Sequence, residues 1–151
     1  MGLDMYLTAK KYVSNYNDDD QALSTELMQH FPELAADQTI QEVTVRVGYW
    51  RKANHIHKWF VDNVQEGEDN CKNYYVGRVQ LDSLRALCQQ VLDFRHLAVE
   101  KLPTVEGFFF GGTDYDEYYF RDVEHTVKII DSALKLLDSE KGWDIEYQSS
   151  W

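Results

Sequence analysis

Hydrophobic and polar residues alternate in three stretches of the chain, at positions 3–9, 38–49 and 143–148. Alternation with a period of two predicts β-strands that bury one face and leave the other polar. In the second stretch the hydrophobic set is Val43, Val45, Val47 and Tyr49. The polar set of the three predicted strands is Asp4, Tyr6, Thr8, Thr44, Arg46, Glu146 and Gln148. Such a face is either solvated or pairs with a second subunit, so a homo-oligomer is one expectation.

Four other stretches place hydrophobic residues three or four positions apart, which predicts amphipathic helices. They cover residues 18–31, 49–64, 77–102 and 114–137. Together the elements predict an α+β fold, with a small, mostly antiparallel three-stranded sheet and about four helices packed on one face. A length of 151 residues is consistent with a single globular domain that spans residues 1–151.

The stretch over residues 49–63 concentrates aromatic, basic and amide side chains. The hydrophobic period changes there from two to that of a helix, so we expect the second strand to run directly into a helix. Gly48 lies at the changeover, where a residue without Cβ permits a sharp bend. His57 falls in the hydrophobic stripe and is expected to be buried. It is either a core histidine or an acid or base tuned by its surroundings.

Three polar residues are expected in the first turns of this helix: Arg51, Lys52 and Asn54. They are either solvated or bind an anion or a partner's carboxylate, which the positive potential of a helix N-terminus favours. His55 and His57 are two residues apart and point in different directions around a helix, so they cannot share one metal ion. No metal site is therefore expected here.

A second unusual stretch, residues 107–120, carries three consecutive phenylalanines between glycines. They cannot all face one core, so at least one is expected to be exposed or to line a groove. Asp114 and Glu117 have the spacing of a capping box that opens the last helix. That structural duty accounts for both acids. The side chains otherwise free to hydrogen-bond a ligand are Tyr115, Asp116 and Tyr118.

The two unusual stretches together make up the candidate recognition surface. Aromatic residues combined with arginine and asparagine are typical both of interface cores and of small-ligand pockets. The predicted ligand- or partner-binding residues are Tyr49, Arg51, Lys52, Asn54, His57, Phe109, Tyr115, Asp116 and Tyr118. This prediction requires the end of the second strand to lie beside the phenylalanine stretch in the fold.

The acidic composition narrows the classes of function. The chain has 26 acidic and 15 basic residues and a net charge of −11. Direct nucleic-acid binding needs a basic footprint and is not expected, whereas an acidic protein can mimic DNA in another protein's basic groove. The chain has no apolar stretch of membrane-spanning length and no secretion signal at its start, so a cytoplasmic protein is expected. Cys71 and Cys88 lack zinc or redox spacing, and no phosphate-binding or calcium motif is present, so no cofactor is expected.

Several motifs are specific enough to suggest a family. They include M-G-L-D-M-Y-L at the start, Y-W-R-K-A-N-x-I-H-K-W-F-V, L-P-T-x-x-G-F-F-F-G, Y-D-E-Y-Y-F and Y-Q-S-S-W at the end. With these motifs the chain resembles, over nearly its whole length, a family of small proteins widespread in bacteriophages, prophages and bacteria. The resemblance implies a phage-associated cytoplasmic protein and implies no activity. The family commonly has a small or polar residue where His55 stands, which lowers His55 as a candidate site residue.

The leading hypothesis is a non-enzymatic binding protein, such as a phage factor that inhibits or redirects a host component, for instance a defence protein. Its partner would be a host protein or a small nucleotide-like ligand. The rival hypothesis is a small hydrolase with His57 as base and Asp116 or Asp69 as its partner. That reaction requires a carboxylate within about 3 Å of His57 in a cleft. An acidic DNA mimic and a purely structural, self-associating protein are further alternatives.

Overall fold

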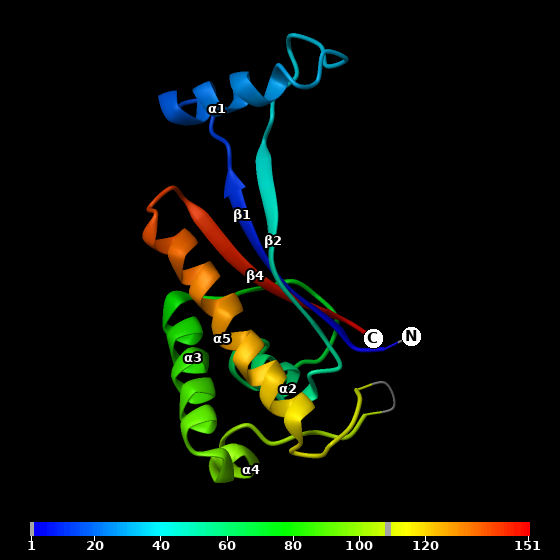
Figure 1. Ribbon diagram of the computed structural model, residues 1–151. Helices are drawn as coiled ribbons and strands as arrows, with labels where there is room; N and C mark the ends of the chain where they lie inside the picture. The colour runs from blue at the N-terminus through cyan, green and yellow to red at the C-terminus, as the bar shows by residue number, and fades with distance from the viewer. Residues whose placement is uncertain (1, 108–109) are drawn as a thin grey trace.

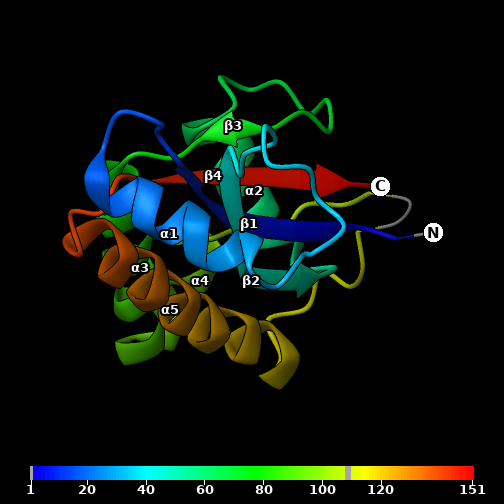
Figure 2. The same ribbon diagram turned by 90° about the horizontal axis from the view of Figure 1, so that it is seen from above.

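Four antiparallel strands form one sheet in the computed structural model, which describes residues 2–107 and 110–151. The strands are β1 (Asp4–Tyr12), β2 (Glu42–Arg51), β3 (Tyr74–Tyr75) and β4 (Trp143–Ser150), in the order β2-β1-β4-β3 (Figures 1 and 2). The predicted α+β class with an antiparallel sheet is confirmed. The predicted number of strands is one too low, because β3 has only two residues and offers no alternation to detect.

Five α-helices and one short 3₁₀ helix complete the described part of the chain. They are α1 (Asp18–Met28), α2 (Asn54–Asn63), α3 (Arg78–Asp93), η1 (Arg95–Leu97), α4 (Ala98–Lys101) and α5 (Glu117–Asp138). The single helix predicted over residues 77–102 is divided, because Phe94 takes a non-helical backbone conformation (φ −135°, ψ 79°) at the end of α3. None of these helices, all within the described residues, has both the length and the hydrophobicity needed to cross a membrane.

The helices are not all packed on one face of the sheet. Helices α2, α3 and α5 cover one face, whereas α1 lies across the far end of β1 and β2 (Figure 1). None of the hydrophobic side chains of α1 is fully buried. The expectation of four helices on one face is therefore corrected for α1, whose apolar surface is too small to hold it against the core.

The hydrophobic face of the sheet forms the core with these three helices. Met5, Leu7 and Ala9 of β1 have no exposed surface. Ile145 and Tyr147 of β4 pair with β1 on the same face and are equally buried. The alternation predicted for the first and third strands is therefore confirmed.

Strand β2 departs from simple alternation. It contains a β-bulge opposite the step from Leu7 to Thr8, whose partners are Gly48 and Arg46. The extra residue, Val47, shifts the side-chain alternation for the rest of the strand. The predicted hydrophobic face of β2 is consequently wrong beyond the bulge, since a bulge leaves no sign in the hydrophobic pattern.

Tyr49 faces away from the core as a result of this bulge. Trp50 faces the helices and is 2% exposed. Tyr49 lies on the opposite face of the sheet, which α2, α3 and α5 do not cover and which we call the open face, and is 40% exposed. The Tyr49 hydroxyl donates a hydrogen bond to Asp4, and its ring centroid lies 5.5 Å from that of Tyr6. On the same face Arg46 lies over the Tyr6 ring at 4.9 Å. The polar face predicted from the alternation is therefore present.

Gly48 is needed for helix packing and not for a bend. A Cβ at this position would overlap the side chain of Ile129 on α5. Strand β2 continues past Gly48 without a sharp turn. The glycine thus allows α5 to approach the sheet closely, which corrects the expected role of this residue.

The turn from β2 into α2 comes later than predicted. β2 ends at Arg51, Lys52 has a positive φ of 59°, and α2 begins at Asn54. The backbone N–H of Lys52 donates to the carbonyl of Leu3 at 2.8 Å, so pairing with the start of the chain extends the strand. The helix predicted over residues 49–64 is therefore wrong for its first five positions.

Candidate functional site

The start of α2 and the segment that follows the phenylalanines lie side by side, as the candidate surface required. The Asn54 amide nitrogen donates to the carbonyls of Phe110 at 3.1 Å and Gly112 at 2.8 Å. Its amide oxygen accepts from the backbone N–H of Val105 at 3.0 Å. Asn54 is 1% exposed, so its side chain is not available to a ligand. Its hydrogen bonds instead hold the segment between α4 and α5, which we call the loop, against the start of α2.

Gly111 completes this contact. Its φ of +89° is unfavourable for a residue with a side chain, and a Cβ there would lie 2.9 Å from the Cβ of Lys52 and 3.1 Å from its carbonyl oxygen. The loop therefore rests directly on the turn between β2 and α2. Both turns have left-handed backbone positions, at Lys52 and Gly111, and together they make one wall of a pocket.

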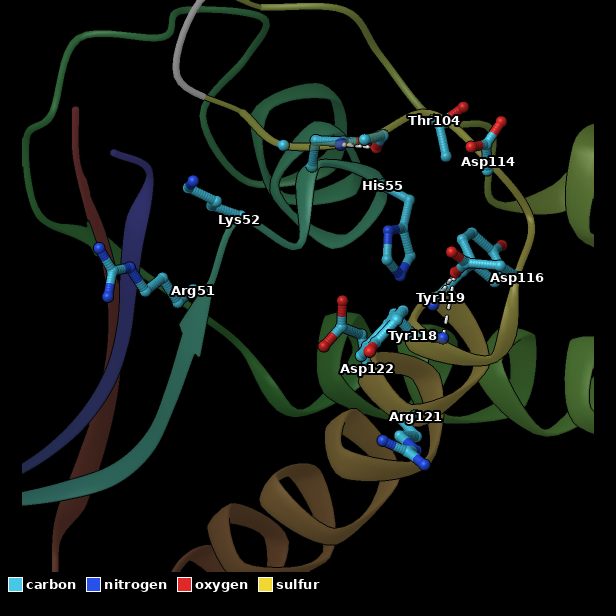
Figure 3. Close-up of a pocket in the computed structure, with 13 residues that line it drawn as sticks. Arg51, Lys52, His55, Thr104, Asp114, Asp116, Tyr118, Tyr119, Arg121 and Asp122 are labelled. Atoms are coloured by element: carbon cyan, nitrogen blue, oxygen red, sulfur yellow. Dashed lines mark hydrogen bonds between the residues drawn. The ribbon is translucent and has the colours of Figure 1, made fainter. Parts of the chain in front are cut away.

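The pocket has a volume of about 400 Å³ and lies between the start of α2, this loop and the first turns of α5 (Figure 3). Its lining residues are Arg51, Lys52, Asn54, His55, Thr104, Gly111, Gly112, Asp114, Asp116, Tyr118, Tyr119, Arg121 and Asp122. Pockets of this volume hold small ligands. Three acids, three permanent cations and one histidine make the lining strongly polar.

His55 is the most unusual residue of the pocket. It is 3% exposed, and its Nε2 atom has no hydrogen-bond partner among the described residues. Burial lowers the pKa of His55 from 6.5 to about 3, so the ring is neutral at ordinary pH. Its centroid lies 4.1 Å from that of Tyr119, with 31° between the rings. The imidazole extends from α2 into the space in front of α5 (Figure 3).

Two carboxylates at the start of α5 face the same space but have different tasks. Asp116 is the N-cap, and its Oδ1 accepts from the backbone N–H groups of Tyr118 at 3.0 Å and Tyr119 at 3.1 Å. This corrects the capping box predicted from Asp114, which lies two residues too early. Asp122 lies one turn into the helix, where burial is the main cause that raises its pKa from 3.8 to about 6.

The cations lie at the mouth of the pocket. Arg51 lies opposite Asp4 in the register of β2 with β1, and its guanidinium points away from His55 (Figure 3). Lys52 is exposed and also points outward. The Arg121 guanidinium lies 5.6 Å from the centroid of the Tyr118 ring. The interior of the pocket is therefore acidic and aromatic, with positive charge at its rim.

His57 lies in a separate, closed cluster beneath the loop. Its Nδ1 lies 2.8 Å from the Tyr147 hydroxyl, and its Nε2 lies 2.9 Å from Oδ2 of Asp69. Since a carboxylate only accepts, Nε2–H donates to Asp69. When the ring carries this one proton, Nδ1 accepts from the Tyr147 hydroxyl. Burial raises the pKa of Tyr147 well above 10, which keeps this donor protonated. The indole N–H of Trp151 donates to the other Asp69 oxygen at 3.0 Å.

This cluster bears directly on the hydrolase hypothesis. Of the two carboxylates considered for a hydrolase, Asp69 lies 2.9 Å from His57, whereas Asp116 caps α5. However, His57 is 1% exposed and both ring nitrogens are engaged. A general base must take up the proton that it abstracts, and neither nitrogen of His57 is free to do so while Tyr147 and Asp69 are bound to it. The geometry supports a structural role for His57.

The predicted binding residues fall into distinct places. Those that line the pocket are Arg51, Lys52, Asn54, Asp116 and Tyr118. Tyr49 lies on the open face of the sheet and His57 in the closed cluster, while the hydroxyl of Tyr115 accepts from the backbone N–H of Thr104 at 3.1 Å. Phe109 lies outside the described residues.

Sequence reasoning missed His55 and Asp122. The family resemblance lowers His55 as a candidate, but in the structure its ring is 3% exposed and lies against Tyr119 of α5. Asp122 lies next to the hydrophobic stripe of α5, between Tyr119 and Val123. The sequence offers one weak indication that Asp122 is half-buried, which is its position as an acid at the edge of a hydrophobic stripe.

Comparisons with known proteins leave the family open. The chain matches no protein-family model, no curated protein and no solved structure. Among the described residues, no three side chains of His, Cys, Asp or Glu gather closely enough to hold a metal ion. The chemistry of the pocket is therefore the basis for a functional proposal.

Proposed function

We propose that this protein is a non-enzymatic binding protein that sequesters a small nucleotide-like ligand in the pocket between α2 and α5. The observation that carries the proposal is His55, a residue of the pocket lining whose buried Nε2 atom has no hydrogen-bond partner among the described residues. A buried polar atom without a partner costs about 1–3 kcal/mol. Gln65 Oε1 and Ser149 Oγ are also buried without a partner among the described residues, but neither residue lines this pocket. A ligand that hydrogen-bonds to this nitrogen would offset that free energy.

The chemistry of the lining supports a planar ligand with both donors and acceptors. The carboxylate of Asp122 accepts hydrogen bonds, as a nucleobase amino or imino group requires, and neutral His55 offers one more donor or acceptor. Tyr118 is 73% exposed at the mouth and presents a ring on which a base can stack. The exposed cations Lys52 and Arg121 at the rim suit a phosphate group.

The electrostatics of His55 favour binding over acid–base catalysis. An efficient general base has a pKa near the working pH. The pKa of His55, at about 3, makes the ring a poor base at neutral pH but a good neutral hydrogen-bonding group. Both ring nitrogens of His57 are engaged by Tyr147 and Asp69, which leaves the second histidine of α2 equally unsuited to catalysis.

The family resemblance supports a phage-associated role for this binding. A phage factor in the cytoplasm of a bacterial host would act by removing a host nucleotide-like ligand from solution. This role requires tight binding and no turnover. It is distinct from inhibition by contact with a host protein, because the ligand would be retained by the purified protein without any second chain.

The direct test is calorimetric titration with a panel of nucleosides and nucleoside mono-, di- and triphosphates. We expect at least one to bind to the wild-type protein with 1:1 stoichiometry, and we expect His55→Leu to weaken binding at least tenfold. His96→Leu is the matched control, since His96 is exposed and does not line the pocket. Failure of the whole panel to bind, or equal affinity in His55→Leu, would overturn the proposal.

The pH dependence of binding gives a second test of the same site. The pKa of Asp122 is raised to about 6, so its carboxyl group is mostly protonated below pH 6 and ionised above it. If base N–H groups donate to the carboxylate, affinity should rise with pH through about 6. Asp122→Asn should flatten this profile. A wild-type profile that does not change between pH 5 and pH 7 would exclude Asp122 as the acceptor.

A further inference from the structure

Strand β2 forms one edge of the sheet, and half of that edge is uncovered. Apart from pairing with β1, the backbone from Glu42 to Arg46 makes no hydrogen bond among the described residues. The other half is closed, because α5 packs on Gly48 and His125 bonds to the carbonyl of Tyr49 at 3.0 Å. Exposed edges are templates for pairing with another strand, so the free half requires an explanation.

The free half is regular in conformation. The β-bulge at Val47 begins immediately after it, and within it each residue keeps one partner on β1. Glu42, Thr44 and Arg46 therefore share the open face, while Val43 and Val45 share the other. Val45 is 43% exposed although it lies in a strand. The edge thus offers unpaired backbone groups and an uncovered apolar side chain together.

The sequence of this segment, E-V-T-V-R, is complementary to itself in the antiparallel direction. If two copies pair about Thr44, Glu42 of each copy lies opposite the partner's Arg46. Val43 lies opposite the partner's Val45, and the two threonines face each other. Opposite charges, β-branched pairs and threonine pairs are the cross-strand combinations that stabilise antiparallel sheets.

We propose that two copies of this chain associate through the Glu42–Arg46 edge of β2, joining their sheets into one continuous antiparallel sheet across a two-fold axis. The charge pattern selects a second copy as the occupant, because a two-fold axis through Thr44 satisfies both charges of both chains at once. This interface involves no residue of the pocket, so dimer formation can be tested independently of the proposed ligand binding.

Charge reversal tests the pairing directly by sedimentation velocity. We expect the wild-type protein to sediment as a dimer, and Glu42→Arg and Arg46→Glu each to sediment as monomers, since each places like charges opposite one another. An equimolar mixture of the two variants should recover the dimer, because each chain then meets its complement. The double variant Glu42→Arg/Arg46→Glu should recover a homodimer for the same reason.

The control is Glu124→Arg, which reverses an exposed charge on α5 and should leave the dimer intact. Far-UV circular dichroism of each variant verifies that it is folded, and recovery of dimer by mixing two monomeric variants would itself demonstrate folding. A monomeric wild-type protein would overturn the proposal. A dimer that persists in both single reversals would overturn it as well, since the interface would then lie elsewhere.

Discussion

Two buried histidines lie two residues apart on the same helix, yet their surroundings differ completely. His55 is 3% exposed and His57 is 1% exposed. Because residues two apart on a helix point in different directions, the His55 ring lies against Tyr119 of α5, whereas the His57 ring lies against Tyr147 of β4 and Phe110. His57 has a partner for each ring nitrogen, whereas Nε2 of His55 has none among the described residues.

The difference teaches how to separate a structural histidine from a binding one. Burial alone does not distinguish them, since both rings are almost fully buried. The partner of each nitrogen does, because a satisfied ring stabilises the fold and an unsatisfied ring beside a pocket has unused hydrogen-bonding capacity. By this criterion His57 and its partners stabilise the fold, whereas His55 is part of the candidate binding site.

The largest expected effect is on the stability of the closed cluster. His57→Ala would leave the Tyr147 hydroxyl and Asp69 without their shared partner and would open a cavity in the core. We expect a loss of about 3 kcal/mol in the free energy of unfolding. Urea denaturation followed by fluorescence measures it. If His55→Ala loses as much at neutral pH, the proposed division between the two histidines is wrong.

Acid stability should distinguish the histidines next. Unfolded His55 takes up a proton below pH 6.5, whereas the folded ring, with a pKa of about 3, does not. The free energy of unfolding is therefore unaffected by protonation of His55 above pH 6.5. It decreases as the pH falls from 6.5 towards 3, because only the unfolded protein binds a proton at His55 in that range. Between pH 7 and about pH 4.5, His55→Leu should lose about 2 kcal/mol less than the wild-type protein. Parallel loss in both proteins would show that His55 does not stay neutral.

Removal of the C-terminal indole should have a smaller effect. Trp151 is 49% exposed, and its N–H donates to Asp69, which keeps its bond to His57 when the indole is removed. We expect Trp151→Ala to cost about 1 kcal/mol. Trp151→Phe keeps a ring against Phe110 but not the donor, so an intermediate loss in thermal unfolding would identify the hydrogen bond as one contributor.

The smallest expected effect is that of His55→Leu on stability at neutral pH. The variant removes an unsatisfied buried nitrogen, which stabilises, and the stacked contact with Tyr119, which destabilises. These contributions are similar in size, so we expect a net change of less than about 1 kcal/mol. A loss as large as that of His57→Ala would mean that His55 already has a structural partner.

The sequence by itself determined the elements whose periodicity is long and local. Strands β1 and β4 and helix α5 follow from the spacing of their hydrophobic residues, because each buries one continuous face. The same reasoning identified the pocket's neighbourhood, since the aromatic and polar residues of two stretches were unusual enough to be grouped. The burial of His57 also followed directly from its place in a hydrophobic stripe.

Only the tertiary structure decided which residues of those stretches are available. A bulge at Val47 turned Tyr49 outward, and hydrogen bonds with Val105, Phe110 and Gly112 occupied the Asn54 side chain. The two partners of His57 lie 12 and 90 residues away in the chain, and the lack of a partner for Nε2 of His55 likewise follows from tertiary packing. Hydrophobic periodicity describes what one segment buries, and it carries no information about which distant side chain meets it there.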